Sequence, residues 1–139
     1  MKMPLLAVAV VALLTSCREP STADWAIDVG IQNIGTNMIK GASVSWGESL
    51  FRAGLVSPTS EAVHVGFDRP IPETATVHYL LPDGRKIAKT VAVKKAIPAV
   101  AYKNKDITVM FEVNSNTDAV TVKILHFIEK DGYNQLVPF

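Results

Sequence analysis

The sequence contains very little cysteine: 139 residues include one, Cys17. A single sulfur excludes an intramolecular disulfide and any metal site that needs two or more thiolates. An excess of charge is also absent, because 14 Lys and Arg stand against 13 Asp and Glu. Proteins that bind nucleic acid or membrane surfaces by charge alone show a clear basic excess. We therefore expect this protein to bind neither in that way.

Long apolar segments are absent as well. The uninterrupted run from Leu5 to Leu14 has ten residues, whereas a spanning helix needs about 20. Lys2 precedes the run, and Thr15, Ser16 and Cys17 follow it before the sequence turns polar. This order is typical of a cleaved signal peptide. The alternative, a buried N-terminal strand or helix with an incidental cysteine, does not explain that order.

The segment Leu14-Thr15-Ser16-Cys17 resembles the lipobox of bacterial lipoproteins. The resemblance implies cleavage before Cys17, acylation of Cys17 with palmitate-type chains, and an anchor on the periplasmic side of a bacterial membrane. Arg18 replaces the Asp that marks inner-membrane retention in many lipoproteins, so the resemblance implies the outer membrane. One of the 14 basic residues precedes Cys17, which leaves 13 basic and 13 acidic residues in the mature chain. The implied parts are a signal peptide (1–16), the lipidated cysteine with a short tether (17–24) and one domain (25–139).

Downstream of the tether, apolar and polar residues alternate with a period of two, as half-buried strands do. No segment has a helical period of useful length. The seven expected strands are residues 25–31, 39–46, 61–67, 74–81, 85–95, 107–113 and 119–128. Short strands separated by turn residues predict an all-β fold, a single antiparallel β-sandwich. Immunoglobulin-like and transthyretin-like topologies both remain open.

Three connecting segments complete the prediction. Pro82-Asp83-Gly84 joins two strands in the clearest hairpin of the chain, since Asp-Gly suits a tight β-turn. Residues 47–60 lack a period and are predicted to form a long loop. Tyr133–Phe139 is apolar enough to dock on the domain, and Pro138 excludes it from a central strand.

Catalytic and metal-binding patterns are lacking. His64, His78 and His126 fall in separate predicted strands, without ligand spacing or clustered carboxylates. Ser43 and Ser45 have no neighbouring base, and no Gly-x-Ser-x-Gly motif occurs. We expect a protein that is not an enzyme and that needs neither a metal nor a cofactor.

Positive charge is concentrated in one stretch. Between residues 85 and 105 no acidic residue occurs, and the basic residues are Arg85, Lys86, Lys89, Lys94, Lys95, Lys103 and Lys105. Arg85, Lys86, Lys94 and Lys95 are therefore candidates for binding an acidic partner or anionic lipid headgroups near the anchor. The alternative is an edge strand whose lysines prevent sheet-to-sheet aggregation, and we favour it.

The predicted loop 47–60 supplies a second candidate surface, with Phe51 beside Arg52. Aromatic and Arg residues in loops often anchor protein interfaces. A loop that folds over the open end of the sandwich explains the same residues equally well.

The chain also resembles the small β-sandwich lipoproteins encoded beside type VI secretion effectors. The resemblance covers roughly residues 25–98, and it rests on the lipobox, Asn33 before a turn, Arg69-Pro70-Ile71-Pro72, Val77-His78-Tyr79, Asp83-Gly84-Arg85 and Val91-Ala92-Val93. It implies an immunity protein that binds a secreted toxic effector, such as a phospholipase, and blocks its active site. Some of these lipoproteins contain cysteine pairs, which this chain lacks; Cys17 alone carries over as a functional residue.

Two other functions agree with the sequence. One is a structural lipoprotein of an envelope or secretion complex, and the other is a carrier of a small ligand or lipid. The expected partners are a protein and, through the lipid anchor, the membrane.

Overall fold

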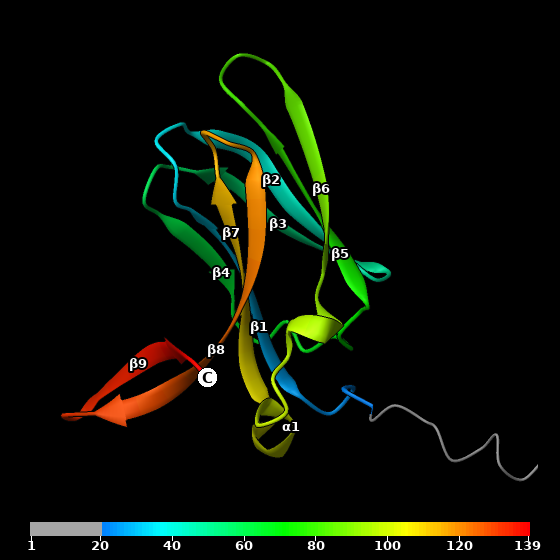
Figure 1. Ribbon diagram of the computed structural model, residues 1–139, viewed down its shortest axis with the longest axis vertical. Coiled ribbons are helices and arrows are strands. Elements are labelled where there is room, and N and C mark those ends of the chain that lie inside the picture. The colour runs from blue at the N-terminus through cyan, green and yellow to red at the C-terminus, as the bar shows by residue number, and fades with distance from the viewer. Residues whose placement is uncertain (1–20) are drawn as a thin grey trace, which may run out of the picture.

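The computed structural model describes residues 21–139, which form two β-sheets packed face to face (Figure 1). The predicted signal peptide and the acylation of Cys17 concern residues outside this part of the chain. The predicted all-β sandwich is confirmed. Within residues 21–139, no helix has the length and apolar character that crossing a bilayer requires.

One sheet has five strands in the order β4-β1-β7-β8-β9, and the other has four in the order β3-β2-β5-β6. The strands are β1 (Ala26–Asn33), β2 (Ile39–Trp46), β3 (Ser49–Val56), β4 (Glu61–His64), β5 (Thr74–Leu80), β6 (Lys86–Ala92), β7 (Asp106–Asn114), β8 (Ala119–Lys130) and β9 (Tyr133–Pro138). The described helices are η2 (Lys94–Ala96) and α1 (Ala101–Asn104), and both are a single turn long.

The core lies between the sheets and follows the alternation read from the sequence. In β2 the buried residues are Ile39, Ala42, Val44 and Trp46, and Ser43 and Ser45 between the last three are half-exposed. Trp46 donates a hydrogen bond from Nε1 to the Pro70 carbonyl at 3.0 Å. Its ring meets Phe67 and Phe111 edge to face, with centroids 6.0 and 6.4 Å apart. Trp46 thus fills the centre of the core while its one polar atom is satisfied.

One strand pair departs from the predicted antiparallel arrangement. β1 and β7 run parallel, in unbroken register from Ala26 opposite Asp106 to Asn33 opposite Val113. Alternation along a strand shows which face is buried but contains nothing about the direction of its neighbour. The prediction of a wholly antiparallel sandwich is wrong at this pair.

The predicted loop 47–60 is also wrong, because its middle part is strand β3, paired with β2 from Trp46 opposite Ser49 to Ile39 opposite Val56. Two features explain why the sequence of β3 lacks the pattern of a strand. Its register shifts near Ala42 and Gly54, where Gly54 has φ +73°, so the inward positions lose their period of two. Leu50 and Leu55 are also exposed, which removes the contrast between the two faces.

Strand bounds differ from the prediction at two other places. β6 ends at Ala92, and Lys94 and Lys95 belong to η2 instead of a strand. The predicted tether also ends earlier than expected, since Thr22 is buried and its hydroxyl accepts a hydrogen bond from the Ile71 N–H at 2.8 Å. Among the residues that the structure describes, contacts with the domain therefore begin at Thr22.

The C-terminal tail docks on the domain as an edge strand, β9, paired with the distal part of β8. β7 pairs with β8 only as far as Leu125, so the segment from His126 to Lys130 has β9 as its strand partner. This two-stranded ribbon extends from one end of the sandwich (Figure 1). We call it the β8–β9 ribbon.

Candidate protein-binding face

The outer side of the four-stranded sheet is the strongest candidate for a binding surface, and we call it the open face. Its side chains lie on the side of β2, β3, β5 and β6 that faces away from the core, and they are exposed or half-exposed. They are predominantly small or hydroxylated, with a few long cations at the margins. The open face consists of Lys40, Gly41, Ser43, Ser45, Leu50, Arg52, Gly54, Thr76, His78, Leu80, Lys86, Ala88 and Thr90.

The two sheets differ in charge, although the chain as a whole is balanced. The four strands of the four-stranded sheet contain no Asp or Glu, and their basic residues are Lys40, Arg52, Lys86 and Lys89. The five-stranded sheet contains two basic residues, Lys123 and Lys130, and five acidic ones, Asp28, Glu61, Asp106, Glu112 and Glu129. The sandwich is therefore polarised, with its positive side at the open face.

Strand register places the polar residues of the open face in rows. Ser43 lies opposite Arg52 on one side and His78 on the other, and His78 lies opposite Ala88. In a neighbouring row, Lys40 is opposite Leu80, which is opposite Lys86. The strand of Lys40 is two positions from that of Lys86, so their backbones lie roughly 10 Å apart. Lys40 and Lys86 therefore lie on either side of Leu80.

Hydrogen bonds hold the polar side chains of the open face in place. Ser45 Oγ lies 3.2 Å from His78 Nε2, and the Thr76 and Thr90 hydroxyls lie 2.8 Å apart. Because these bonds link β2 to β5 and β5 to β6, they fix side chains across the sheet. Side chains that are already fixed lose little entropy when a partner docks on them.

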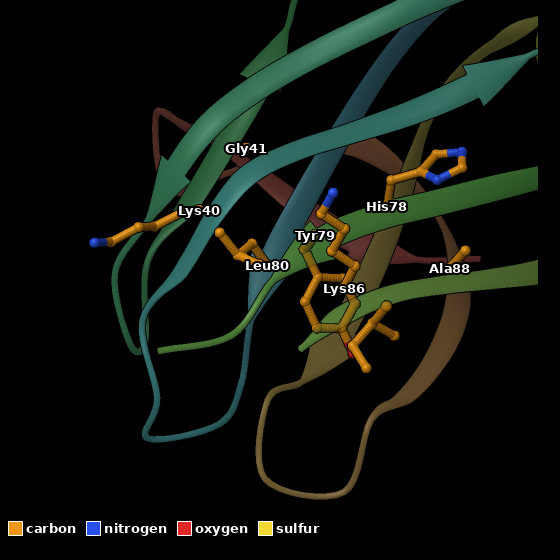
Figure 2. A pocket seen from close by; sticks show the side chains of 8 residues that line it. Lys40, Gly41, His78, Tyr79, Leu80, Lys86 and Ala88 are labelled. Carbon is orange, nitrogen blue, oxygen red and sulfur yellow. The ribbon is translucent and has the colours of Figure 1, made fainter. Parts of the chain in front are cut away.

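Two adjoining hollows shape the open face. One, of about 290 Å³, is lined by residues of β2, β5 and β6, among them Lys40, His78 and Lys86 (Figure 2). Figure 2 shows Lys86 directed from β6 across β5 toward β2, whereas the Lys40 side chain points away from the hollow. The other hollow, of about 370 Å³, is lined by residues of β2 and β3, including Ser43 and Arg52. Gly41 borders both.

The basic residues predicted to act together are spread along the β6 edge. Arg85 and Lys86 lie at the end of β6 next to the β5–β6 turn, and Lys94 and Lys95 lie beyond its other end. Lys94 is half-buried, with Nζ 3.7 Å from Glu73 Oε1. Of the four, Lys86 alone lies on the open face. β6 is an edge strand, which supports the alternative that its lysines protect the edge.

Arg85 is engaged within the domain. Its guanidinium donates to Asp83 Oδ2 at 2.8 Å and to Asp118 Oδ2 at 3.1 Å, and so joins the β5–β6 turn to the β7–β8 turn. Hydrogen bonds from Arg85 lower the pKa of Asp83. Nearby, burial and then the Asp118 carboxylate raise the pKa of the Tyr79 hydroxyl to about 12. This cluster stabilises the meeting of two turns and leaves Arg85 little freedom to bind a partner.

The side chains of Phe51 and Arg52 lie on opposite sides of β3. Phe51 is 4% exposed and packs in the core, with its ring centroid 6.4 Å from that of Phe67. Arg52 is exposed and belongs to the open face. Phe51 is therefore a core residue, and of the two predicted loop anchors only Arg52 is accessible to a partner.

The three histidines are far from forming one site. The His64 ring lies 5.2 Å from that of Phe67, and His126 stacks on Phe139 with centroids 4.1 Å apart. His78 belongs to the open face. Among residues 21–139, no group of three or more His, Cys, Asp or Glu side chains is placed to hold a metal ion.

Lys40 was not predicted as a site residue. It is a single basic residue in a strand, and only the pairing of β2 with β5 places it in the row of Lys86. One feature of the sequence points to Lys40 as a site residue: from Ile39 to Val56 the only acidic residue is Glu48, which lies in the β2–β3 turn.

Comparison with known proteins adds the following. No protein-family model matches the chain, and no curated protein matches it. A protein from Eubacterium rectale, solved by NMR, is similar to it in structure, with a TM-score of 0.48 and 16% sequence identity. The match covers 73% of this chain and 90% of the other.

Proposed function

We propose that this protein is a membrane-tethered periplasmic binding protein that recognises an acidic surface of another protein through the open face. The partner we propose is a secreted toxic effector, such as a phospholipase, which this chain inhibits as an immunity protein. The observation that carries the proposal is the absence of any carboxylate from the four strands that bear Lys40, Arg52 and Lys86.

Charge of one sign on one face of the domain favours one class of partner. It attracts an acidic surface during encounter and repels a basic one. Long-range attraction acts mainly on the rate of association, while the small side chains of the open face permit close backbone approach. The hollows beside Ser43 and His78 accept protruding side chains of the partner.

A lipid on Cys17 would place this domain at the membrane. Tethering raises the local concentration of an inhibitor at the surface that a membrane-active effector must reach, without adding any contact. Burial of Thr22 leaves few residues between the domain and Cys17, so the domain would stay near the bilayer.

The test is capture of partners from periplasmic extract of the source bacterium by the full chain with a C-terminal tag. The variant Arg52→Glu/Lys86→Glu reverses charge on the open face. The matched control Lys95→Glu/Lys103→Glu reverses two exposed lysines elsewhere. We expect one stoichiometric secreted protein, captured by the parent and the control and lost by the open-face variant, whose toxic activity falls when the parent chain is added.

Three results would overturn the proposal. Capture of envelope-complex subunits would favour a structural lipoprotein. Equal loss of capture in both charge variants would remove the open face from the interface. A captured protein that keeps its full activity when bound would exclude an inhibitor.

A further inference from the structure

The β8–β9 ribbon is held to the domain at Phe139, which packs against the core, but from His126 to Lys130 it has no third strand among residues 21–139. Two-stranded ribbons without a third strand are marginally stable in water. In this ribbon Phe127 is 56% exposed and Tyr133 is 75% exposed, and Leu136 and Val137 are half-buried. A further strand along β9 would flank Tyr133, Leu136 and Val137 and would pair the free backbone groups of this edge.

β9 is also unusual among the edges of the two sheets. The other edges are β3, β4 and β6, and each contains a charged residue: Arg52 in β3, Glu61 in β4, and Lys86 and Lys89 in β6. Charges on edge strands are a common protection against unwanted strand pairing. β9 contains none, from Tyr133 to Pro138. This edge therefore lacks the charges that the other three have, and Pro138 at its last position is the one protective residue in it.

We infer that β9 is a dimerisation edge, on which β9 of a second copy of this chain pairs in antiparallel orientation. An uncharged strand can pair with its own copy in any register without bringing like charges together, whereas a charged strand is limited to registers that keep its charges apart. The pairing would join two five-stranded sheets into one continuous sheet, as in strand addition. This inference does not depend on the proposed function, because β9 lies in the other sheet from the open face.

Two-fold symmetry gives the pairing a sharp signature. In a regular antiparallel pair of identical strands, one residue must lie opposite its own copy. A cysteine at that residue forms an intermolecular disulfide. A cysteine one position away lies roughly 8 Å from its copy, beyond the 7 Å Cα limit for a disulfide.

The experiment is a cysteine scan in the full chain carrying Cys17→Ser, kept in mild detergent and exposed to a mild oxidant. Single cysteines replace Asn134, Gln135, Leu136 and Val137 in turn. Controls with the same chemistry are Ala62→Cys on the β4 edge and Thr90→Cys on the β6 edge. We expect one β9 position to give most of the covalent dimer and both controls to give little. No dimer at any β9 position, or equal dimer at β9 and control positions, would overturn the inference.

A second measurement covers the case in which cysteine disturbs the ribbon. The mass of the Cys17→Ser chain by light scattering, corrected for detergent, is compared with those of Gln135→Lys and Gln135→Ser. We expect the parent and the serine variant to be dimers and the lysine variant to be a monomer with unchanged circular dichroism. A monomeric parent, or a lysine variant that remains dimeric, would contradict the inference.

Discussion

Gly35 in the β1–β2 turn lies directly against Ser115 in the β7–β8 turn: a Cβ atom on Gly35 would lie 2.5 Å from the Ser115 backbone nitrogen. The contact joins turns that connect different pairs of strands. Asn116 Oδ1 reinforces it by accepting a hydrogen bond from the Thr36 N–H at 2.8 Å. Only glycine fits here, because the Ser115 backbone leaves no room for a Cβ atom and cannot move aside as a flexible side chain can.

Gly35→Ala should therefore destabilise the domain. We expect the free energy of unfolding to fall by about 1–3 kcal/mol, the usual cost of overpacking a closed site. Urea unfolding of the variant and the parent measures this. Ser60→Ala, in an exposed turn, is the control and should change stability by less than about 0.5 kcal/mol. A Gly35→Ala domain as stable as the parent would show that the two turns are not in contact.

Asn33→Ala should destabilise the domain through lost hydrogen bonds. The buried Asn33 amide donates to the carbonyls of Asn37 at 2.7 Å and Val56 at 3.2 Å, and it accepts from the Gly35 N–H at 3.0 Å. Alanine leaves these groups unpaired, and we expect a loss of about 3 kcal/mol. Asn33→Asp keeps the acceptor but not the donors, so it should also destabilise. If the aspartate variant matched the parent in chemical unfolding, the two donated bonds would contribute nothing.

Tyr79 should make stability depend on pH at high pH. Its pKa is raised from 10.0 to about 12 in the folded domain. Between these values the unfolded chain loses the phenolic proton and the folded domain keeps it. Stability is then fully present below about pH 10 and is lost as the pH rises toward 12. Unfolding by urea at pH 9 to 11 should show this decline in the parent, and Tyr79→Phe should show a smaller one. Equal slopes in the two proteins would exclude Tyr79 as the source.

The complex with the acidic partner should be sensitive to salt. Raising ionic strength from about 0.05 to 0.5 M shortens the screening length several-fold. We expect the association rate constant to fall at least about tenfold, with a smaller change in the dissociation rate. Stopped-flow mixing measures both. An association rate constant that does not change with salt would show that the partner binds an uncharged surface of this protein.

The strands with clean alternation were predictable from sequence, and those without it were not. Ile39–Trp46 and the hairpin around Asp83-Gly84 lie where expected, because β2 and β5 each bury one face and Asp-Gly suits the turn that joins β5 to β6. β3 was missed because the register shift at Gly54 breaks its period. Neither the sequence of β1 nor that of β7 indicates that the two strands run parallel.

The open face was less predictable than the fold. Lys40, Arg52 and Lys86 are distant in sequence, and they share a face only because β3, β2, β5 and β6 are neighbours in that order. The basic stretch from Arg85 to Lys105 is conspicuous in the sequence, yet the fold distributes it along an edge and its ends. Proximity in sequence was a poor guide to proximity on the surface.

The position of β1 between β4 and β7 has a consequence for synthesis of the chain. β1 is complete at Asn33, yet its parallel partner begins at Asp106. At translation rates of about 5–20 residues per second, several seconds pass before that partner emerges. One hydrogen-bonding edge of an apolar strand stays open throughout. We therefore expect the unfolded chain to be a client of chaperones that bind extended segments, and the five-stranded sheet to close only once β7 can pair with β1.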